Sequence, residues 1–342
     1  MVYTLTSLLA LAGLAMAQQA CNGYPSLCSK SYNEVSYLTT HNSYAFMSSV
    51  GQNQHYDVQT QLDDGIRGLK LSAVKSSNYT GVELCHTACN ILDAGSAHDT
   101  LGVVASWLKN NPNEVVTIMW NNLGNFSASE LQSEYQQASG IMDYLYVQPN
   151  NNYTWPTLSE MISSGKRLVN FMDVNADQTT VPWLHDEYTY IFETPYDNTN
   201  VSQLGCAIDR PQDPASPGQM MYVMNNFIYG TLEVGSIQIE LPQPYQANIT
   251  NAAAFENHAT NCTSVLGRPP NFLEVDFYNW GTTFQVLDKM NNVTYVVKSL
   301  NHGANSDSGH SDATSGVEAF GEAAFITAAA LTLVAIFVTL IF

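Results

Sequence analysis

Basic residues are scarce in this sequence. Its 342 residues include 11 lysines and arginines against 30 aspartates and glutamates, which gives a formal net charge of −19 at pH 7. A charge of this sign repels nucleic acids and anionic bilayers alike. We therefore expect no nucleic-acid partner, and any phosphate-bearing substrate would have to be bound by a local site of opposite charge.

Cysteine is also scarce, with six residues in the chain. No two of them form a Cys-x-x-Cys motif, so metal-binding and thiol-redox functions are disfavoured. An even number of cysteines is typical of a chain folded in an oxidising compartment, where disulfides are the default state. We predict the pairs Cys21–Cys28, Cys85–Cys89 and Cys206–Cys262.

Long hydrophobic runs are confined to the two ends of the chain. The run Leu5 to Met16 closes on Ala15-Met-Ala17, which is typical of a cleaved secretory signal, so we expect residues 1–17 to be removed. Seven Asn-x-Ser/Thr sequons fit a surface that passes through the secretory pathway. They lie at Asn78, Asn125, Asn152, Asn200, Asn248, Asn261 and Asn292.

The second run, Ala323 to Phe342, is long enough to cross a bilayer, and no charge follows it. A polar stretch rich in small residues precedes it, which predicts a signal for a glycosylphosphatidylinositol (GPI) anchor rather than a tail-anchored helix. We place the attachment at Ser311, with Ser306, Ser308 and Ser315 as alternatives. Residues 301–311 are then a spacer, residues 312–342 are removed, and the protein is secreted to the cell surface and held at the plasma membrane or wall.

Residues 18–300 are expected to form one monomeric domain of the α/β class. Eight short strands, several separated by helical segments, are the number required for a (β/α)8 TIM-type barrel. They are predicted at Val35–Thr40, the end of Gln61–Ser72, Val82–Cys85, Val115–Trp120, Arg167–Phe171, Tyr188–Phe192, Met220–Phe227 and Phe272–Phe277. The link between the second and third strands is too short for a helix, so the barrel should be irregular there.

Helices are predicted from side-chain spacing and capping motifs. Leu101, Val104, Ala105 and Leu108 have the spacing of one helix face within 100–110. Two capping boxes, Ser127-x-x-Glu130 and Thr157-x-x-Glu160, each predict a helix start. Further helices are expected at 252–263 and 283–291.

Polar residues follow the predicted strands at their carboxyl ends, where the active site of such a barrel gathers. Two histidines, His41 and His86, end successive strands and could act as a general base and a general acid. One alternative is a metal site built from these histidines with Asp173, Glu193 and Asp276, but their spacing is not that of a metal motif. The other six histidines lie in polar or loop contexts that are typical of solvated surface.

Several segments, in order along residues 21–300, resemble the phosphatidylinositol-specific phospholipase C superfamily, and its secreted fungal branch of PLC-like phosphodiesterases in particular. They are Leu38-Thr-Thr-His-Asn-Ser-Tyr, Gln61-Leu-Asp-Asp-Gly-Ile-Arg, Leu84-Cys-His-Thr-Ala-Cys, Asn111-Pro-Asn-Glu-Val-Val, Trp155-Pro-Thr-Leu-Ser-Glu-Met-Ile, Gly165-Lys-Arg-Leu-Val and Asn271-Phe-Leu-Glu-Val-Asp-Phe. The resemblance implies an irregular TIM barrel that cleaves a phospholipid or inositol-phosphate diester. His41 matches the general base, His86 the general acid, and Asp276 the carboxylate that orients a histidine.

The resemblance also marks departures. Calcium-dependent members have an acidic pair on the second strand, and metal-free bacterial members have Asp-x-Arg, whereas this chain has Lys70-Leu-Ser72. A calcium ion would lack its usual acidic ligands here, so we expect no cofactor. We expect Lys70 to supply the positive charge that offsets the charge of the phosphate instead. Asn42 matches a position that contacts phosphate or calcium. We assign substrate binding to Asn42, Lys70, Ser72, Arg67, Asn121 and Asp173, although Arg67 could pair with Asp63 or Asp64.

Two other functions remain open. A catalytically silent barrel could bind a glycan or phospholipid headgroup at the wall through aromatic residues such as Trp120, Trp155, Trp183 and Trp280. Hydrolysis of glycerophosphodiesters is less favoured. The metal that this chemistry requires is normally bound by glutamates near the first histidine, whereas His41 is followed by Asn42 and Ser43.

Overall fold

The computed structural model describes residues 19–77, 79–86, 88–234, 237–297 and 300. The predicted signal peptide (1–17), spacer (301–311) and anchor signal (312–342) therefore lie outside the described residues. Within the described part, no helix has both the length and the apolar character needed to cross a membrane.

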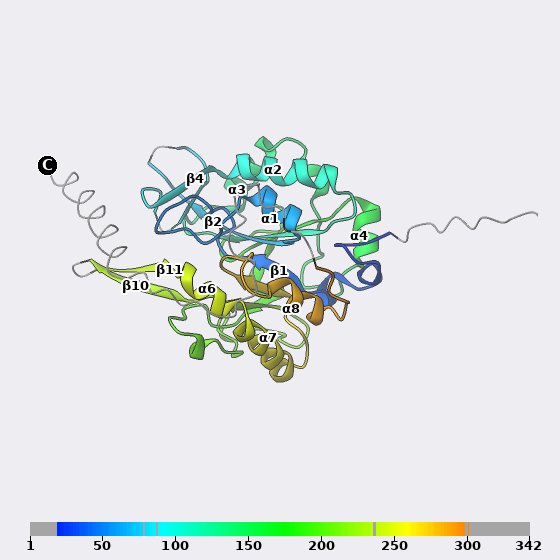
Figure 1. Cartoon of the computed structure of the whole chain (residues 1–342). Coiled ribbons are helices and arrows are strands. Elements are labelled where there is room, and N and C mark those ends of the chain that lie inside the picture. The colour runs from blue at the N-terminus through cyan, green and yellow to red at the C-terminus, as the bar shows by residue number, and fades with distance from the viewer. Residues whose placement is uncertain (1–18, 78, 87, 235–236, 298–299, 301–342) are drawn as a thin grey trace, which may run out of the picture.

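A curled sheet of eight parallel strands forms the centre of the fold (Figure 1). In spatial order these strands are β7 (Leu184–Asp186), β6 (Leu168–Met172), β5 (Val116–Asn121), β2 (Gly68–Val74), β1 (Tyr37–Thr40), β12 (Phe272–Val275), β9 (Met221–Asn226) and β8 (Ile191–Glu193). The first and last strands of the chain are neighbours, and β7 and β8 are the two edges. The prediction of an irregular (β/α)8-type barrel is confirmed, and the pairings between the described residues leave it open between β7 and β8.

Two of the predicted wall strands need correction. Val82–Cys85 corresponds to β3 (Glu83–His86), which pairs antiparallel with β2 and with β4 (Leu92–Ser96) and so stands outside the parallel wall. The link between β2 and β3 is short, and a short link allows an antiparallel hairpin but not a parallel crossover. The eighth wall strand is β7, which we did not predict, and the predicted strand Tyr188–Phe192 begins as the helical turn α5 (Glu187–Tyr190) before β8.

Helices cover the outside of the sheet, and two of them begin at the predicted capping boxes. In α2 (Ala97–Asn110), Ser96 caps the first turn. Both capping boxes are formed, at α3 (Ala128–Gln137) and at α4 (Leu158–Ser164), which ends at Gly165 with φ +73°. The remaining helices are α1 (Val58–Asp64), α6 (Pro244–Thr250), α7 (Ala253–Leu266) and α8 (Thr283–Met290), with short 3-10 helices at Pro25–Leu27, Tyr32–Glu34, Ile141–Tyr144 and Val201–Gln203.

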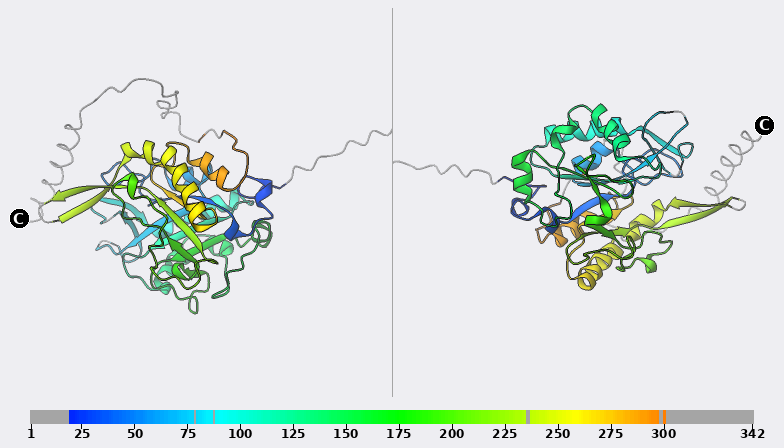
Figure 2. Two further views of the ribbon diagram at one scale, coloured as in Figure 1. Left: turned by 90° about the horizontal axis from the view of Figure 1, so that it is seen from below. Right: turned by 180° about the vertical axis from the view of Figure 1, so that it is seen from behind.

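A hairpin of β10 (Tyr229–Val234) and β11 (Ile237–Pro242) follows β9 and forms a separate two-stranded sheet. It extends away from the body of the molecule in all three views (Figures 1 and 2). This hairpin was not predicted from the sequence. Its first residue, Tyr229, is buried beside the carboxyl end of β1, so the hairpin begins next to the predicted site.

The two faces of the curled sheet bury separate hydrophobic clusters. Leu38, Leu69 and Leu273 belong to the outer cluster, which also contains residues of α1, α2 and α8. Tyr37 and Phe272 belong to the inner one. Because alternate residues of a strand share a face, the inner face of β12 continues from Phe272 to Glu274 and then toward Asp276. The interior thus changes from apolar to charged toward the carboxyl ends of the strands.

All three predicted disulfides are present. Cys21 is bonded to Cys28, Cys85 to Cys89, and Cys206 to Cys262. The last bond ties the long loop after β8 to α7.

Candidate active site

His41 directly follows β1 and is bound to Asp276, which directly follows the neighbouring strand β12. The distance from His41 Nδ1 to Asp276 Oδ1 is 2.9 Å, and both side chains are buried. Asn53 Nδ2 donates to the same carboxylate oxygen at 2.8 Å. The carboxylate therefore orients the imidazole and accepts its Nδ1 proton, which leaves Nε2 as a proton acceptor.

Asn42 connects this pair to β2. Its Nδ2 lies 3.2 Å from His41 Nε2, and an amide donor at this position agrees with an unprotonated Nε2. Its Oδ1 accepts from Ser72 Oγ at 3.0 Å and from the Tyr44 hydroxyl at 3.3 Å. The predicted residues His41, Asn42, Ser72 and Asp276 are thus brought together in one network.

An aromatic ring covers one face of His41. The rings of His41 and Phe227 are stacked, with centroids 3.9 Å apart and planes 4° from parallel. Tyr229 meets the same imidazole edge-on at 6.1 Å. These contacts restrict rotation of the imidazole and exclude water from that side.

His86 is the last residue of β3 and is buried. Burial lowers its pKa to about 4, a shift that the nearby His41 reinforces and Asp276 opposes. The Tyr44 hydroxyl contacts both Asn42 and the carbonyl of Cys85, so His86, at the end of the antiparallel strand β3, lies near His41. The ring packs against Gly51, where an added Cβ would lie 2.9 Å from Nδ1.

Lys70 is enclosed by carboxyl groups inside the barrel. Its Nζ lies 2.7 Å from Glu193 Oε1 and 3.3 Å from Glu187 Oε1. Glu193 also pairs with Arg210, and Glu274 lies close enough to act on Lys70 electrostatically. We call these five residues the interior charge cluster. By strand alternation Lys70 lies one inner-face position below Ser72.

Burial and charge set the ionisation of this cluster. Burial disfavours the Lys70 ammonium, but Glu187 and Glu193 outweigh it and raise the Lys70 pKa well above its usual value. Burial raises the pKa of Glu187, with Glu193 adding to the effect against Lys70. Burial also opposes ionisation of Glu193, yet Lys70 and Arg210 hold the pKa of Glu193 below its usual range. Within this cluster Glu193 therefore favours its ionised form, paired with Lys70 and Arg210, whereas burial disfavours the charges of Glu187 and Glu274.

The other predicted binding residues are placed differently. Asn121 ends β5 beside Ser72, so it lies at the site. Asp173 follows β6 and accepts the Asn122 amide at 2.9 Å; burial raises its pKa, and Lys70 opposes the rise. Arg67 precedes β2 at the opposite end, where its Nε lies 2.8 Å from Glu114 Oε2. The structure thus separates Arg67 from the site, and its partner is neither Asp63 nor Asp64.

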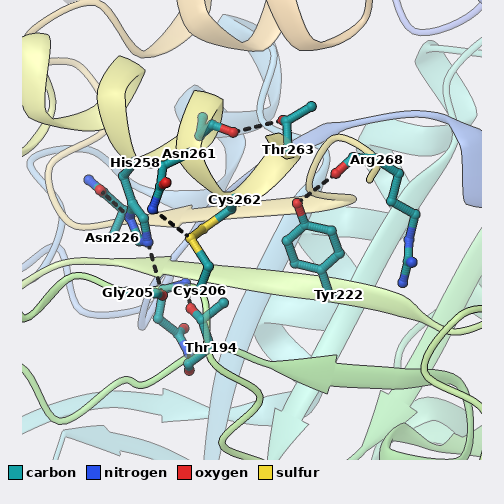
Figure 3. Close-up of a disulfide and its surroundings, with 12 residues drawn as sticks. Thr194, Gly205, Cys206, Tyr222, Asn226, His258, Asn261, Cys262, Thr263 and Arg268 are labelled. Carbon is teal, nitrogen blue, oxygen red and sulfur yellow. Dashed lines mark hydrogen bonds between the residues drawn. A yellow bond between two sulfur atoms is a disulfide. The ribbon is translucent and has the colours of Figure 1, made fainter. Parts of the chain in front are cut away.

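Several residues interpreted as surface are in fact buried. His185 is fully buried, accepts the Gln148 amide at 2.9 Å and has a pKa lowered to about 4 by burial. His258 lies between Asn226 and the carbonyl of Gly205, beside the Cys206–Cys262 disulfide (Figure 3). The polar residues around these histidines in the sequence suggested exposure to solvent, whereas both imidazoles are buried and hydrogen-bonded. Two of the other four, His302 and His310, lie outside the described residues.

Aromatic and metal alternatives have little structural support. Trp120, Trp155 and Trp183 are core residues, which leaves Trp280 as the half-buried member of the proposed glycan surface. The potential ligand groups found among the described residues are Cys206, His258 and Cys262, and Glu83, Cys85 and Cys89. Each contains a disulfide, so its sulfurs are not available as thiolate ligands.

The donor set also does not fit calcium. Calcium requires several carboxylate or carbonyl oxygens around one position. Here the ammonium of Lys70 already lies between Glu187 and Glu193, and Ser72 is hydrogen-bonded to Asn42. These side chains therefore do not form a calcium site of the usual kind.

Several residues around the site come from loops and from the strand interior and were not predicted as site residues. Asn53 and Arg210 lie in segments without periodicity, and Phe227, at the end of the predicted strand Met220–Phe227, carries no local sign of its contact with His41. Glu274 could have been predicted from the sequence, because a glutamate inside the apolar strand Phe272–Val275 has to face either a charged partner or an interior site. Its Oε2, like Oδ2 of Asp276, is buried and has no hydrogen-bond partner among the described residues.

Comparison with known proteins identifies relatives along most of the chain. The PI-PLC X family model matches residues 27–291. An uncharacterized secreted protein of Arthroderma benhamiae is 39% identical over 80% of this chain, which spans 64% of that protein's length. A PI-PLC X domain-containing protein of the same fungus is 37% identical over 79% of this chain and 89% of its own.

The fold is also found among solved structures. The phosphatidylinositol-specific phospholipase C from Listeria monocytogenes aligns with 82% of this chain and 99% of its own, with a TM-score of 0.50 and 15% sequence identity. At this identity the likeness concerns the barrel fold alone.

Proposed function

Because this chain belongs to the PI-PLC X domain family, we propose that it is a phosphoric diester hydrolase of the phospholipase C type. The observation that carries the proposal is the hydrogen bond between His41 and Asp276, with His86 in the same buried site. A carboxylate on Nδ1 makes an imidazole a general base at Nε2, and a second histidine supplies the acid.

The proposed reaction is an internal displacement at phosphorus. Nε2 of His41 takes the proton from a hydroxyl of the headgroup, and the hydroxyl oxygen attacks the phosphorus. Protonated His86 donates its proton to the departing alkoxide, which yields a cyclic phosphate and an alcohol such as diacylglycerol. The ring is neutral near pH 7 without substrate, so the negative phosphate has to raise the pKa of His86 on binding.

Lys70 and Arg210 are the proposed source of positive charge. Removing a preorganised charge from a transition state costs several kcal/mol of barrier, on the order of 3. In the interior charge cluster burial disfavours the charges of Glu187 and Glu274, while Glu193 favours its ionised form, so we propose that part of the positive charge of Lys70 and Arg210 acts on the phosphate. The basic residues at the carboxyl edge of the described sheet are these two and the exposed Lys75, which favours a headgroup without further phosphates.

We propose that the enzyme acts outside the cell. Six of the seven sequon asparagines are described, and all six are exposed, as glycosylation requires. The three disulfides and the secreted relative support export. A GPI anchor attached near Ser311 would then hold the protein at the cell surface.

The test uses purified residues 18–311 with phosphatidylinositol, its bisphosphate and a GPI-anchored protein, each with and without chelator. We expect cyclic phosphate from the first or third substrate, unchanged by chelator, and little from the bisphosphate. The parent is compared with His41→Ala.

A second candidate function is binding without turnover, which the engagement of Lys70 by two glutamates favours. Headgroup binding without product from any of the three substrates would establish it in place of hydrolysis.

A further inference from the structure

The Cys85–Cys89 disulfide encloses the candidate general acid. His86 directly follows Cys85, and the two cysteines are four positions apart. Cys85 is fully buried, whereas Cys89 is half-buried. The other two bonds lie elsewhere, one near the amino terminus and one between the loop after β8 and α7.

The backbone at this disulfide is connected to the base. The carbonyl of Cys85 accepts the Tyr44 hydroxyl at 2.9 Å, and the same hydroxyl lies 3.3 Å from Oδ1 of Asn42, next to His41. On the far side, the Ala88 amide donates to the carbonyl of His86 at 2.6 Å. The position of the Cys85 backbone therefore sets how far the acid lies from the base.

A bond over so short a loop contributes little to global stability by chain entropy, because that contribution grows with loop length. The Cys206–Cys262 bond, with a separation of 56, has the larger contribution. The short bond acts locally, by restricting the segment that follows β3.

We propose that the Cys85–Cys89 disulfide is a positioning element for His86, which holds the imidazole at the distance from His41 that proton transfer to the leaving group requires. This inference rests on the proposed function. Displacing a catalytic group by about 1 Å can lower a rate roughly 100-fold. Opening the bond therefore lowers kcat while leaving the barrel folded.

Chemical reduction opens the Cys85–Cys89 bond as well, by thiol–disulfide exchange. A thiolate of a dithiol reductant attacks the Cys89 sulfur, which is the more accessible one, and Cys85 leaves as a thiolate that takes up a proton. The second thiol of the reductant then closes its own ring disulfide and releases Cys89 as a thiol. Two cysteines are reduced, and one dithiol is oxidised.

The test compares Cys85→Ala/Cys89→Ala with the matched control Cys21→Ala/Cys28→Ala, using phosphatidylinositol in mixed micelles. We expect kcat of the first variant to fall roughly 10- to 100-fold with KM within about twofold, and the control to retain parental kcat. NMR titration adds a readout that does not depend on turnover. The pKa of His86, about 4 in the parent, should rise toward the ordinary value once the ring leaves its buried position.

An unchanged kcat and an unchanged His86 titration in a folded variant would overturn the proposal. If the variant fails to fold, native protein is treated with graded dithiothreitol, and the opened cysteines are identified by alkylation and mass spectrometry. Activity should fall in step with the fraction of Cys85–Cys89 opened, which is read from alkylated aliquots, and should return when reduced protein that was not alkylated is reoxidised; activity that persists with Cys89 alkylated also refutes the role. A parent without turnover on any phosphodiester refutes the proposed function, and the positioning role with it.

Discussion

Replacing Lys70 by methionine tests the interior charge cluster. The side chain of Lys70 is 8% exposed, and those of its partners Glu187 and Glu193 are 0% exposed. Removing one partner of a buried ion pair typically costs about 3–5 kcal/mol, because the remaining charge stays desolvated. At roughly 2 °C per kcal/mol for a chain of this size, Tm should fall by about 5–10 °C.

The chain offers a matched control for this substitution. Lys289 lies 2.7 Å from Glu256, the same distance as between Lys70 and Glu193, but these side chains are 53% and 49% exposed. An exposed pair contributes at most about 1 kcal/mol, so Lys289→Met should shift Tm by less than about 2 °C. Both variants are compared with the parent by calorimetry at pH 7.

Equal shifts for the two variants would refute the argument from burial. Turnover of Lys70→Met is then measured well below its Tm, so that a lower rate reflects chemistry rather than unfolding. A rate equal to that of the parent, with chelator present in both, would show that Lys70 does not neutralise the phosphate.

The remaining predictions concern the histidines and the carboxyl-terminal tail. His41→Ala and His86→Ala should each remove nearly all turnover, and the double variant should be no slower than either single one, because base and acid act in one step; a much slower double variant contradicts the pairing. Stability should fall as the pH drops from about 6.5 to about 4. The pKa values of His86 and His185 are about 4 in the folded protein and about 6.5 in the unfolded chain, so protons bind the unfolded chain first and favour unfolding. The loss is up to roughly 3 kcal/mol per histidine, and a Tm that stays flat over this range in calorimetric scans would contradict it. Deleting Ala323 to Phe342 should release protein into the medium, and membrane-bound truncated protein would count against the anchor.

The sequence predicted those features that have a period or a local chemical signature. The capping boxes at Ser127 and Thr157 mark real helix starts, and the apolar run around Ile118 is a wall strand. The disulfide pairing was also predicted correctly. Apart from the Cys206–Cys262 bond, these features depend on residues close together in the sequence, so they can be predicted from the sequence of one protein.

The features of the fold and the site that were not predicted depend on contacts between segments that are distant in the sequence. The strands β7 and β8 have three residues each, too few for alternation to be visible. Arg210 reaches Glu193 from a loop without periodicity, and Phe227 covers His41 from the turn after β9. The lysine at the end of a strand was expected to be free for substrate, but its glutamate partners could be recognised only after the wall had been assembled.

The open seam between β7 and β8 has a consequence for self-association. An unpaired strand edge can template another chain, and long flat edges are the usual starting points of aggregation. Here β7 and β8 offer only three residues each, and the edge of β8 is already occupied. The amide of Glu193 donates to the carbonyl of Arg210 at 2.7 Å, and the amide of Asp209 donates to the carbonyl of Glu193 at 2.9 Å. The loop that supplies Arg210 to the interior therefore also protects the edge of β8 from pairing with a strand of another molecule.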